Sequence, residues 1–157
     1  MIVLVRIDDR LIHGQVATTW LRSFDIQQVI VVADDIAGHE LQKTVLDISA
    51  PAGVKVHLFY TDEFIEKYHR SKITRRTMLI FTNPREVIRC IDGGVEIPYL
   101  NVGGMRYAPG KKKLTKSVSA FDEDIVAFKE LIQRGVVVEN QMVANDKIVP
   151  LEKVLPQ

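Results

Sequence analysis

Short apolar, β-branched runs alternate with amphipathic stretches along the chain, and this alternation limits the possible folds more than any other feature. Strands covered on both faces read as continuous apolar runs, whereas helices repeat their apolar residues every three to four positions. The sequence predicts strands at residues 2–7, 29–33, 54–60, 78–81, 99–102 and from 136 onward, and helices at residues 15–24, 40–48, from 61 onward, 85–91 and 122–133. This order is typical of an α/β fold with a doubly wound, mostly parallel sheet and helices on both faces.

Local signals place several boundaries. Thr61 is expected to cap the third helix, because acidic residues that suit a first helical turn follow it. Gly103 and Gly104 are expected to close the fifth strand, and residues 111–113 to lie in a loop. The tail near residues 148–149 is expected to add a pairing at the sheet edge.

Size and composition bound the class of protein. The chain has 157 residues without repeats or Pro/Gly/Ser-rich linkers, which predicts one domain spanning residues 1–157. A formal net charge of +1 gives no reason to expect nucleic-acid or membrane-surface binding. Cys90 is the one cysteine, so no internal disulfide can form and a reducing compartment fits. No apolar run approaches the roughly 20 residues that span a bilayer, and no signal peptide is evident, so we expect a cytoplasmic protein.

Chemistry in such folds gathers at one edge of the sheet. Ligands bind where strands end and helices begin, at the carboxyl ends of the strands. The segments expected there are residues 6–14, 34–35, 60–61, 81–83 and 102–104.

His13 lies in the first of these segments, between the first strand and the first helix. The free N–H groups and the dipole of a helix N-terminus favour a phosphate or phosphoryl anion. Gly14 lets the backbone approach such an anion, and Arg6 and Arg10 can supply forked donors to its oxygens. Because a neutral imidazole is a competent nucleophile, these residues predict phosphoryl chemistry at His13. A histidine that only caps the helix or lies in the loop is the alternative.

Asp8 and Asp9 complicate this site, because carboxylates repel a phosphoryl group. Either one of them, Asp8 being the better candidate, orients an arginine or the His13 ring, or both simply cap the loop. The sequence contains no glycine-rich phosphate loop and no metal-type cluster of histidines and cysteines, so we predict neither a metal nor a cofactor.

These residues carry a resemblance to a known family. The segment Val5-Arg-Ile-Asp-Asp-Arg-Leu-Ile-His-Gly-Gln-Val16, followed by Trp20, closely resembles the opening motif of the IIB components of the mannose/fructose/sorbose/N-acetylgalactosamine family of the bacterial phosphotransferase system. The resemblance continues into Phe81-Thr-Asn-Pro84 and Asn101-Val-Gly-Gly-Met105 and so covers essentially the whole chain.

The resemblance implies an open α/β domain that relays a phosphoryl group. Such a domain accepts the group from a phosphohistidine of the IIA component, holds it on its own histidine at Nδ1, and passes it to a sugar that enters through the membrane components IIC and IID. His13 matches the phosphorylated histidine, and Arg6, Asp8 and Arg10 match positions that shape the active-site loop. The protein would then work at the inner face of the membrane through IIC and IID. Neither the sugar nor the oligomeric state follows, and a homo-oligomer stays open.

Other residues have two interpretations each. Thr82 and Asn83 either donate to the phosphoryl oxygens, Thr82 and Gly14 being the phosphate-binding candidates, or they start the fourth helix. The lysines at 111–113, with Arg106, form either a solvated loop or a patch that meets an acidic partner. Structural or surface roles are expected for the remaining candidates: His39, His57, His69, Cys90, Val16, Trp20 and Leu21.

Two rival functions remain open at this point. Histidine phosphatases also place an Arg-His-Gly group after a first parallel strand, but here Ile12 precedes His13 and no obvious second histidine follows a later strand. The other rival is a non-catalytic, ligand-binding α/β domain, against which the absence of a glycine-rich loop argues.

Overall fold

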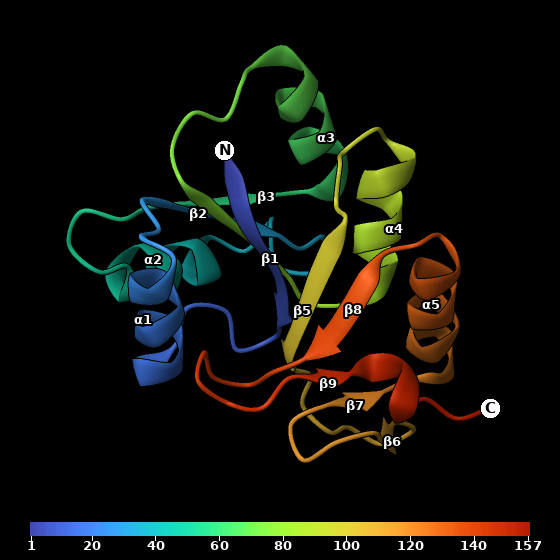
Figure 1. Cartoon of the computed structure of the whole chain (residues 1–157). Helices are drawn as coiled ribbons and strands as arrows, with labels where there is room; N and C mark the ends of the chain where they lie inside the picture. Colours follow the sequence, from blue (N-terminus) through green and yellow to red (C-terminus); the bar gives the residue numbers. More distant parts are fainter.

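A mostly parallel sheet forms the middle layer of the molecule (Figure 1). The computed structural model describes residues 1–157 apart from the side chains of Gln15 and Val16. The strands run in the order β3-β2-β4-β1-β5-β8-β9, with bounds β1 (Ile2–Asp8), β2 (Gln28–Val32), β3 (Lys55–Phe59), β4 (Thr77–Phe81), β5 (Tyr99–Gly104), β8 (Val137–Asn140) and β9 (Val149–Pro150). Only β9 is antiparallel to its neighbour among these strands, and it forms the predicted edge pairing.

Helices cover both faces of this sheet, as the sequence predicted (Figure 1). On one face lie α1 (Gly14–Ser23) and α2 (Glu40–Ser49), and on the other lie α3 (Thr61–Arg70), α4 (Pro84–Asp92) and α5 (Asp122–Gln133). A short 3₁₀ turn, η1 (Leu151–Lys153), ends the ordered elements. The predicted doubly wound architecture is therefore confirmed.

The two faces of the sheet bury separate cores, because successive strand side chains point to opposite sides. Met78 and Ile80 of β4 pack with Trp20 of α1 and Leu46 of α2. Leu79 and Phe81, which alternate with them in β4, belong to the opposite core. There they join apolar side chains of α3, α4 and α5: Phe64, Val87, Cys90, Phe128 and Leu131. The Val16 side chain, which the sequence assigned to this packing, lies outside the described residues.

The strand order places the carboxyl end of β1 at a switch in chain direction. The chain winds outward from β1 to β2 and β3, and then returns so that β1 lies between β4 and β5. The segments that follow β1, β4 and β5 therefore meet at one edge, where crevices of such sheets bind ligands.

The third helix begins at Thr61, as predicted, but Thr61 is not its N-cap. Tyr60 is the N-cap and makes no side-chain cap, and Thr61 is the first residue of α3. The Asp34 side chain supplies the missing acceptor instead, since the Thr61 backbone N–H donates to its Oδ1 at 2.7 Å. A cap provided from 27 positions away leaves no local signal in the sequence.

Two other local predictions need correction. Gly103 and Gly104 do not follow the fifth strand but form its last two residues. Residues 111–113 are not a plain loop, because β6 (Lys112–Lys113) pairs antiparallel with β7 (Ser119–Ala120) to form a hairpin.

Candidate functional site

A cleft of about 590 Å³ opens at the carboxyl edge of the sheet. It is lined by residues from each of the loops that follow β1, β2, β4 and β5, and from the start of α5: Asp9, Arg10, Leu11, His13, Asp35, Ile36, Gln42, Thr82, Asn83, Arg85, Met105, Arg106, Lys111, Phe121 and Asp124. Three of the five segments predicted to gather there, at residues 6–14, 34–35 and 81–83, line the cleft, whereas residues 60–61 and 102–104 do not.

His13 stands at the N-terminus of α1 with an exposed side chain that lines the cleft. Its backbone is extended, with φ −143° and ψ 121°, and its side chain makes no capping hydrogen bond to the helix. The capping alternative is therefore wrong for the His13 ring. Gly14 follows at φ +62°, in the left-handed region that favours glycine. Nothing lies within 4 Å of the position that a Gly14 Cβ would occupy, so the space beside this backbone is open.

Asp8 fixes the position of Arg10 beside His13. The Arg10 Nε donates to Asp8 Oδ1 at 2.9 Å, and its Nη2 donates to Oδ2 at 2.8 Å. The backbone N–H of Arg10 also donates to Oδ1, at 3.1 Å. This bidentate pairing holds the guanidinium in one plane, and the hydrogen bond to Asp8 raises the pKa of Arg10. The structure therefore presents a fixed cation at the cleft.

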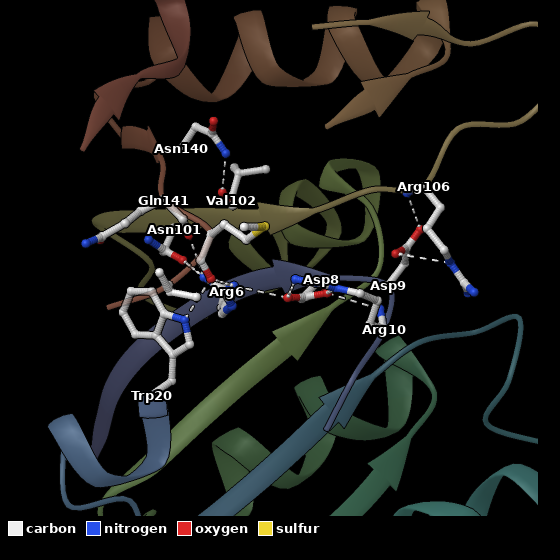
Figure 2. Close-up of polar contacts among 12 residues, drawn as sticks. Arg6, Asp8, Asp9, Arg10, Trp20, Asn101, Val102, Arg106, Asn140 and Gln141 are labelled. Carbon is white, nitrogen blue, oxygen red and sulfur yellow. Dashed lines mark hydrogen bonds and ion pairs between the residues drawn. The ribbon is translucent and has the colours of Figure 1, made fainter. Parts of the chain in front are cut away.

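Arg6 lies beneath the cleft and does not line it. Its side chain is about 3% exposed and donates to the Asp8 carboxylate at 3.0 Å. It also donates to the carbonyl oxygens of Gln141 and Met142, at 2.9 and 2.7 Å, and to Asn101 (Figure 2). Burial lowers the pKa of Arg6, and Asp8 opposes that change. Arg6 thus supports Asp8 from below and does not face the cleft.

The Arg6 guanidinium also packs on Trp20 of α1, with its central carbon 4.6 Å from the ring centroid. The Trp20 Nε1 donates to the Met142 carbonyl oxygen at 3.1 Å. Trp20 and Leu21 are buried, which confirms that they serve in helix packing. The same contacts connect α1, β1 and the loop after β8 into one support for the site (Figure 2).

Asp9 has a different partner from Asp8. Its Oδ2 accepts the backbone N–H of Arg106 at 2.8 Å, and its Oδ1 lies 3.6 Å from the Arg106 Nε (Figure 2). Asp8 therefore orients arginines of β1 and its loop, whereas Asp9 attaches the loop after β5. The structure answers the question that the sequence left open for the two carboxylates.

Asn83 starts α4, as one interpretation predicted. Its Oδ1 accepts the Glu86 backbone N–H at 3.1 Å, and Pro84 occupies the first helical position. Thr82 and Asn83 nevertheless both line the cleft. The structure thus brings Thr82 and Gly14 to the same edge as His13.

Glu86 forms a buried connection behind the cleft. Its Oε1 accepts the Asp34 backbone N–H at 2.9 Å, whereas its Oε2 has no hydrogen-bond partner among the described residues. Burial raises the pKa of the Glu86 carboxyl to about 7. Burial also disfavours ionised Asp34, but hydrogen bonds from Thr61 and Arg89 outweigh it and lower the pKa of Asp34.

Several contributors to the site escaped the sequence analysis. Asn101 lay in a motif but received no role, although it accepts a hydrogen bond from Arg6. Arg85 pairs with Asp124 at 3.1 Å across the cleft wall, and Gln42 reaches the cleft from α2. Arg106 was assigned only to a lysine-rich loop or patch, although it lies two residues after Gly104, where the carboxyl-edge rule could have indicated a place in the cleft. Pairs between distant segments leave no spacing signal.

The remaining candidates have structural positions. Cys90 is fully buried, and burial raises its pKa to about 12, which suits a core residue. The His69 Nε2 lies 2.6 Å from the Gly93 carbonyl oxygen, His57 stacks on Phe59, and His39 precedes α2 without capping it. None of these three histidines lines the cleft.

Two searches of the described residues gave negative results. Within that part of the chain, no group of three or more His, Cys, Asp or Glu residues is placed to hold a metal ion. No helix of the described structure is long and apolar enough to cross a membrane.

The site combines an exposed histidine at the switch point of a doubly wound sheet with an arginine that an aspartate holds in place. These features define an α/β domain suited to anion chemistry. The sequence model described as PTS system sorbose subfamily IIB component matches residues 2–157. The chain therefore belongs to the IIB components of the sorbose/mannose family of the phosphotransferase system, which are phosphoryl-transfer domains.

Individual relatives agree with this assignment. The chain is 43% identical to the sorbose-specific EIIB component of Klebsiella pneumoniae, over 92% of this chain and 89% of that protein. It is 44% identical to the mannose-specific EIIAB component of Escherichia coli, over 93% of this chain but 46% of that protein. The chain thus spans about half the length of the EIIAB proteins. The crystal structure of the IIBSor domain from the K. pneumoniae sorbose permease superposes with a TM-score of 0.93 at 42% identity, covering 98% of this chain and 95% of that one.

Proposed function

We propose that His13 carries a phosphoryl group between a IIA donor and a sugar delivered by membrane components of the IIC and IID type. The observation that carries this proposal is the exposed His13 ring in the cleft beside Arg10, which Asp8 holds by two hydrogen bonds. The similarity to a mannose-specific EIIAB component supports it, because that relative combines A and B components in one chain.

The chemistry asked of each residue is limited. A lone pair of the His13 ring attacks phosphorus, the bond from phosphorus to the donor nitrogen breaks, and its electron pair stays on the donor imidazole. Arg10 supplies positive charge to the equatorial oxygens as this exchange proceeds, and the N–H groups at the start of α1 add to it. In the second transfer a sugar hydroxyl oxygen attacks phosphorus, and the bond from phosphorus to the His13 nitrogen breaks with its electron pair returning to the ring. The freed imidazole nitrogen can take up the proton that the hydroxyl loses. By family resemblance, the attacking atom of His13 is Nδ1.

An exposed site is needed for such a relay. Two partners must reach His13 in turn, so neither can bury it permanently, and contacts of this kind are modest in area and short-lived. We further propose that residues 1–157 act as one domain, supported by the family match over residues 2–157, and that the domain associates with the inner face of the membrane through IIC and IID.

A phosphoryl-transfer assay tests this function. The protein is incubated with labelled phosphoenolpyruvate, the general phosphotransferase proteins and a IIA component of this family. We expect acid-labile label on the wild type and none on His13→Ala. Rapid release of inorganic phosphate would instead favour the histidine-phosphatase alternative. The structure argues against that alternative, because His13 is the only histidine among the described residues lining the cleft and no second histidine faces it there. Absence of label on a folded wild-type protein would rule out the carrier.

A further inference from the structure

A cluster of five cations, two of them unpaired, borders the His13 cleft and has no part in the function described so far. It lies on residues 106–116, here called the basic hairpin, which lead from β5 through β6 towards β7. This segment contains no Asp or Glu and five cations: Arg106, Lys111, Lys112, Lys113 and Lys116. Since the whole chain has a formal net charge of +1, its positive charge is concentrated here.

The hairpin is held firmly in place at the carboxyl edge of the sheet (Figure 1). Met105 and Ser117 form a backbone hydrogen bond of 2.9 Å, and the Ser119 N–H returns to the Met105 carbonyl at 2.9 Å. The Arg106 backbone N–H is fixed by Asp9, the neighbour of Arg10. The cations therefore keep a defined position relative to His13.

The five cations differ in their partners. Arg106 pairs with Asp9, and Lys112 lies 3.1 Å from Asp122. Lys111 donates to the Arg106 carbonyl at 2.7 Å and lies over Phe121. Lys113 and Lys116 are exposed and form no hydrogen bond or ion pair with the described residues. Their charges are available to a partner.

Lys113 and Lys116 line a hollow of about 480 Å³ between the basic hairpin and the loop after β1. Arg10 and Arg106 belong to both this hollow and the His13 cleft, so the two form a continuous surface. Tyr107, which is 69% exposed, stands at its rim. The one carboxylate that lines the hollow, among described residues, is Asp9, which Arg106 already neutralises.

We propose that the basic hairpin is the docking surface for an acidic face of the protein that donates the phosphoryl group to His13. This inference rests on the proposed function. The donor brings an anionic phosphohistidine to the cleft, whereas the sugars for which the relatives are named, such as mannose and sorbose, are uncharged. Cations beside the point of transfer accelerate the encounter with an anionic partner and fix its orientation. A concave surface that adjoins the cleft also suits protruding acidic side chains better than a flat lipid surface.

The test measures the rate of His13 phosphorylation against the concentration of phosphorylated IIA. The variant Lys113→Glu/Lys116→Glu reverses the two unpaired charges, and Lys55→Glu/Lys72→Glu makes the same change at exposed lysines near the amino edge of the sheet. We expect the hairpin variant to raise the KM for the donor about tenfold with little change in the rate at saturation, and to weaken the salt dependence of the reaction. The control pair should leave the KM within about twofold.

Two further arms keep the outcomes distinct. Potassium phosphoramidate, a small phosphoryl donor without an acidic face, should label the hairpin variant and the wild type equally. Lys113→Gln/Lys116→Gln, which removes charge without reversing it, should give an intermediate KM and guards against misfolding of the double Glu variant. If neither donor labels His13 in the wild type, the proposed function itself fails.

The docking proposal fails separately if labelling occurs and the KM for IIA is unchanged in the hairpin variant. It fails also if only transfer to sugar in IIC/IID membranes becomes slower, or if only binding to vesicles containing anionic lipid is lost. Those results would assign the hairpin to the membrane component or to the lipid surface.

Discussion

Asp8 connects two arginines that differ in exposure. Arg6 is buried beneath it, while Arg10 lies at the cleft with a side chain that is 30% exposed. A carboxylate held from below by a buried guanidinium cannot move freely, so it presents Arg10 in one orientation. Prearranged charge of this kind stabilises a transition state without reorganisation during the reaction.

Arg10→Ala should therefore slow phosphorylation of His13 by about 100-fold or more, because it removes the fixed cation from the cleft. The protein should still fold, since Arg6 continues to pair with Asp8. Stopped-flow labelling gives the rate, and thermal unfolding monitors the fold. Arg134→Ala serves as the control, because Arg134 pairs with Asp92 at the surface and does not line the cleft. Equal rates for Arg10→Ala and wild type would contradict the role given to Arg10.

Arg6→Met should act mainly on stability. It leaves the Asn101 side chain and the Gln141 carbonyl oxygen without this donor, whereas the Met142 carbonyl oxygen keeps the Trp20 Nε1. It also removes one of the two cations that pair with the buried Asp8. Breaking a buried charge pair costs about 3 kcal/mol. Urea denaturation should show a loss of that order, larger than the loss in Arg10→Ala. A stability equal to the wild type would mean that Arg6 does not support the site.

Glu86 predicts a pH dependence of stability. Its pKa is about 7 in the folded protein against 4.5 as the ordinary value, so the folded state keeps a proton that the unfolded state loses. The free energy of unfolding should therefore fall as the pH rises from about 4.5 to about 7, by about 3 kcal/mol from this group.

Glu86→Gln should reduce that pH dependence and raise stability at pH 8, because the Gln carbonyl oxygen can still accept the Asp34 N–H. Urea titrations at pH 5 and pH 8 measure the difference. If the two proteins lost stability in parallel between these pH values, the raised pKa of Glu86 would be refuted.

At the scale of elements, the end of β5 is shaped by what lies over it. A Cβ at Gly103 would overlap the Arg6 guanidinium, and one at Gly104 would lie 3.1 Å from both Arg10 and Asp8. Neither glycine has a positive φ, so their role here is to make room for charged side chains. The strand can continue to Gly104 only because these two residues lack side chains.

Gly103→Ala should therefore displace Arg6 and cost about 2 kcal/mol, as overpacking a buried site does. It should also slow phosphorylation, because Asp8 and Arg10 move with Arg6. Gly53→Ala is the comparison, since it meets no atom within 4 Å and costs only the strain of a φ of +84°. Chemical denaturation and the labelling rate measure both effects. A Gly103→Ala protein with wild-type rate would show that the arginine array tolerates displacement.

The sequence was sufficient for the elements and for the location of the site. Apolar periodicity is local, so it marked β1, β4 and α5 closely, and the carboxyl-edge rule brought His13, Thr82 and Asn83 together. It was insufficient for pairings across the fold, such as Arg6 with Gln141, 135 residues apart. The cap that Asp34 provides for Thr61 and the hairpin at β6 also depend on tertiary contacts that no local pattern encodes.

At the scale of the whole molecule, the sheet separates rigid support from an accessible surface. Two buried cores hold β1, β4 and β5 in register, and the loops at their carboxyl ends form an open cleft. A donor and an acceptor can then use the same His13 in turn, with the basic hairpin on one side of the cleft available to the donor.

The most direct test of this account is the ³¹P NMR spectrum of the protein after incubation with phosphorylated IIA. We predict one resonance in the range of N-phosphoryl imidazole, absent from His13→Ala and lost when membranes containing IIC, IID and the cognate sugar are added. A resonance that persists in His13→Ala, or a spectrum that shows only inorganic phosphate, would contradict a phosphoryl relay through His13.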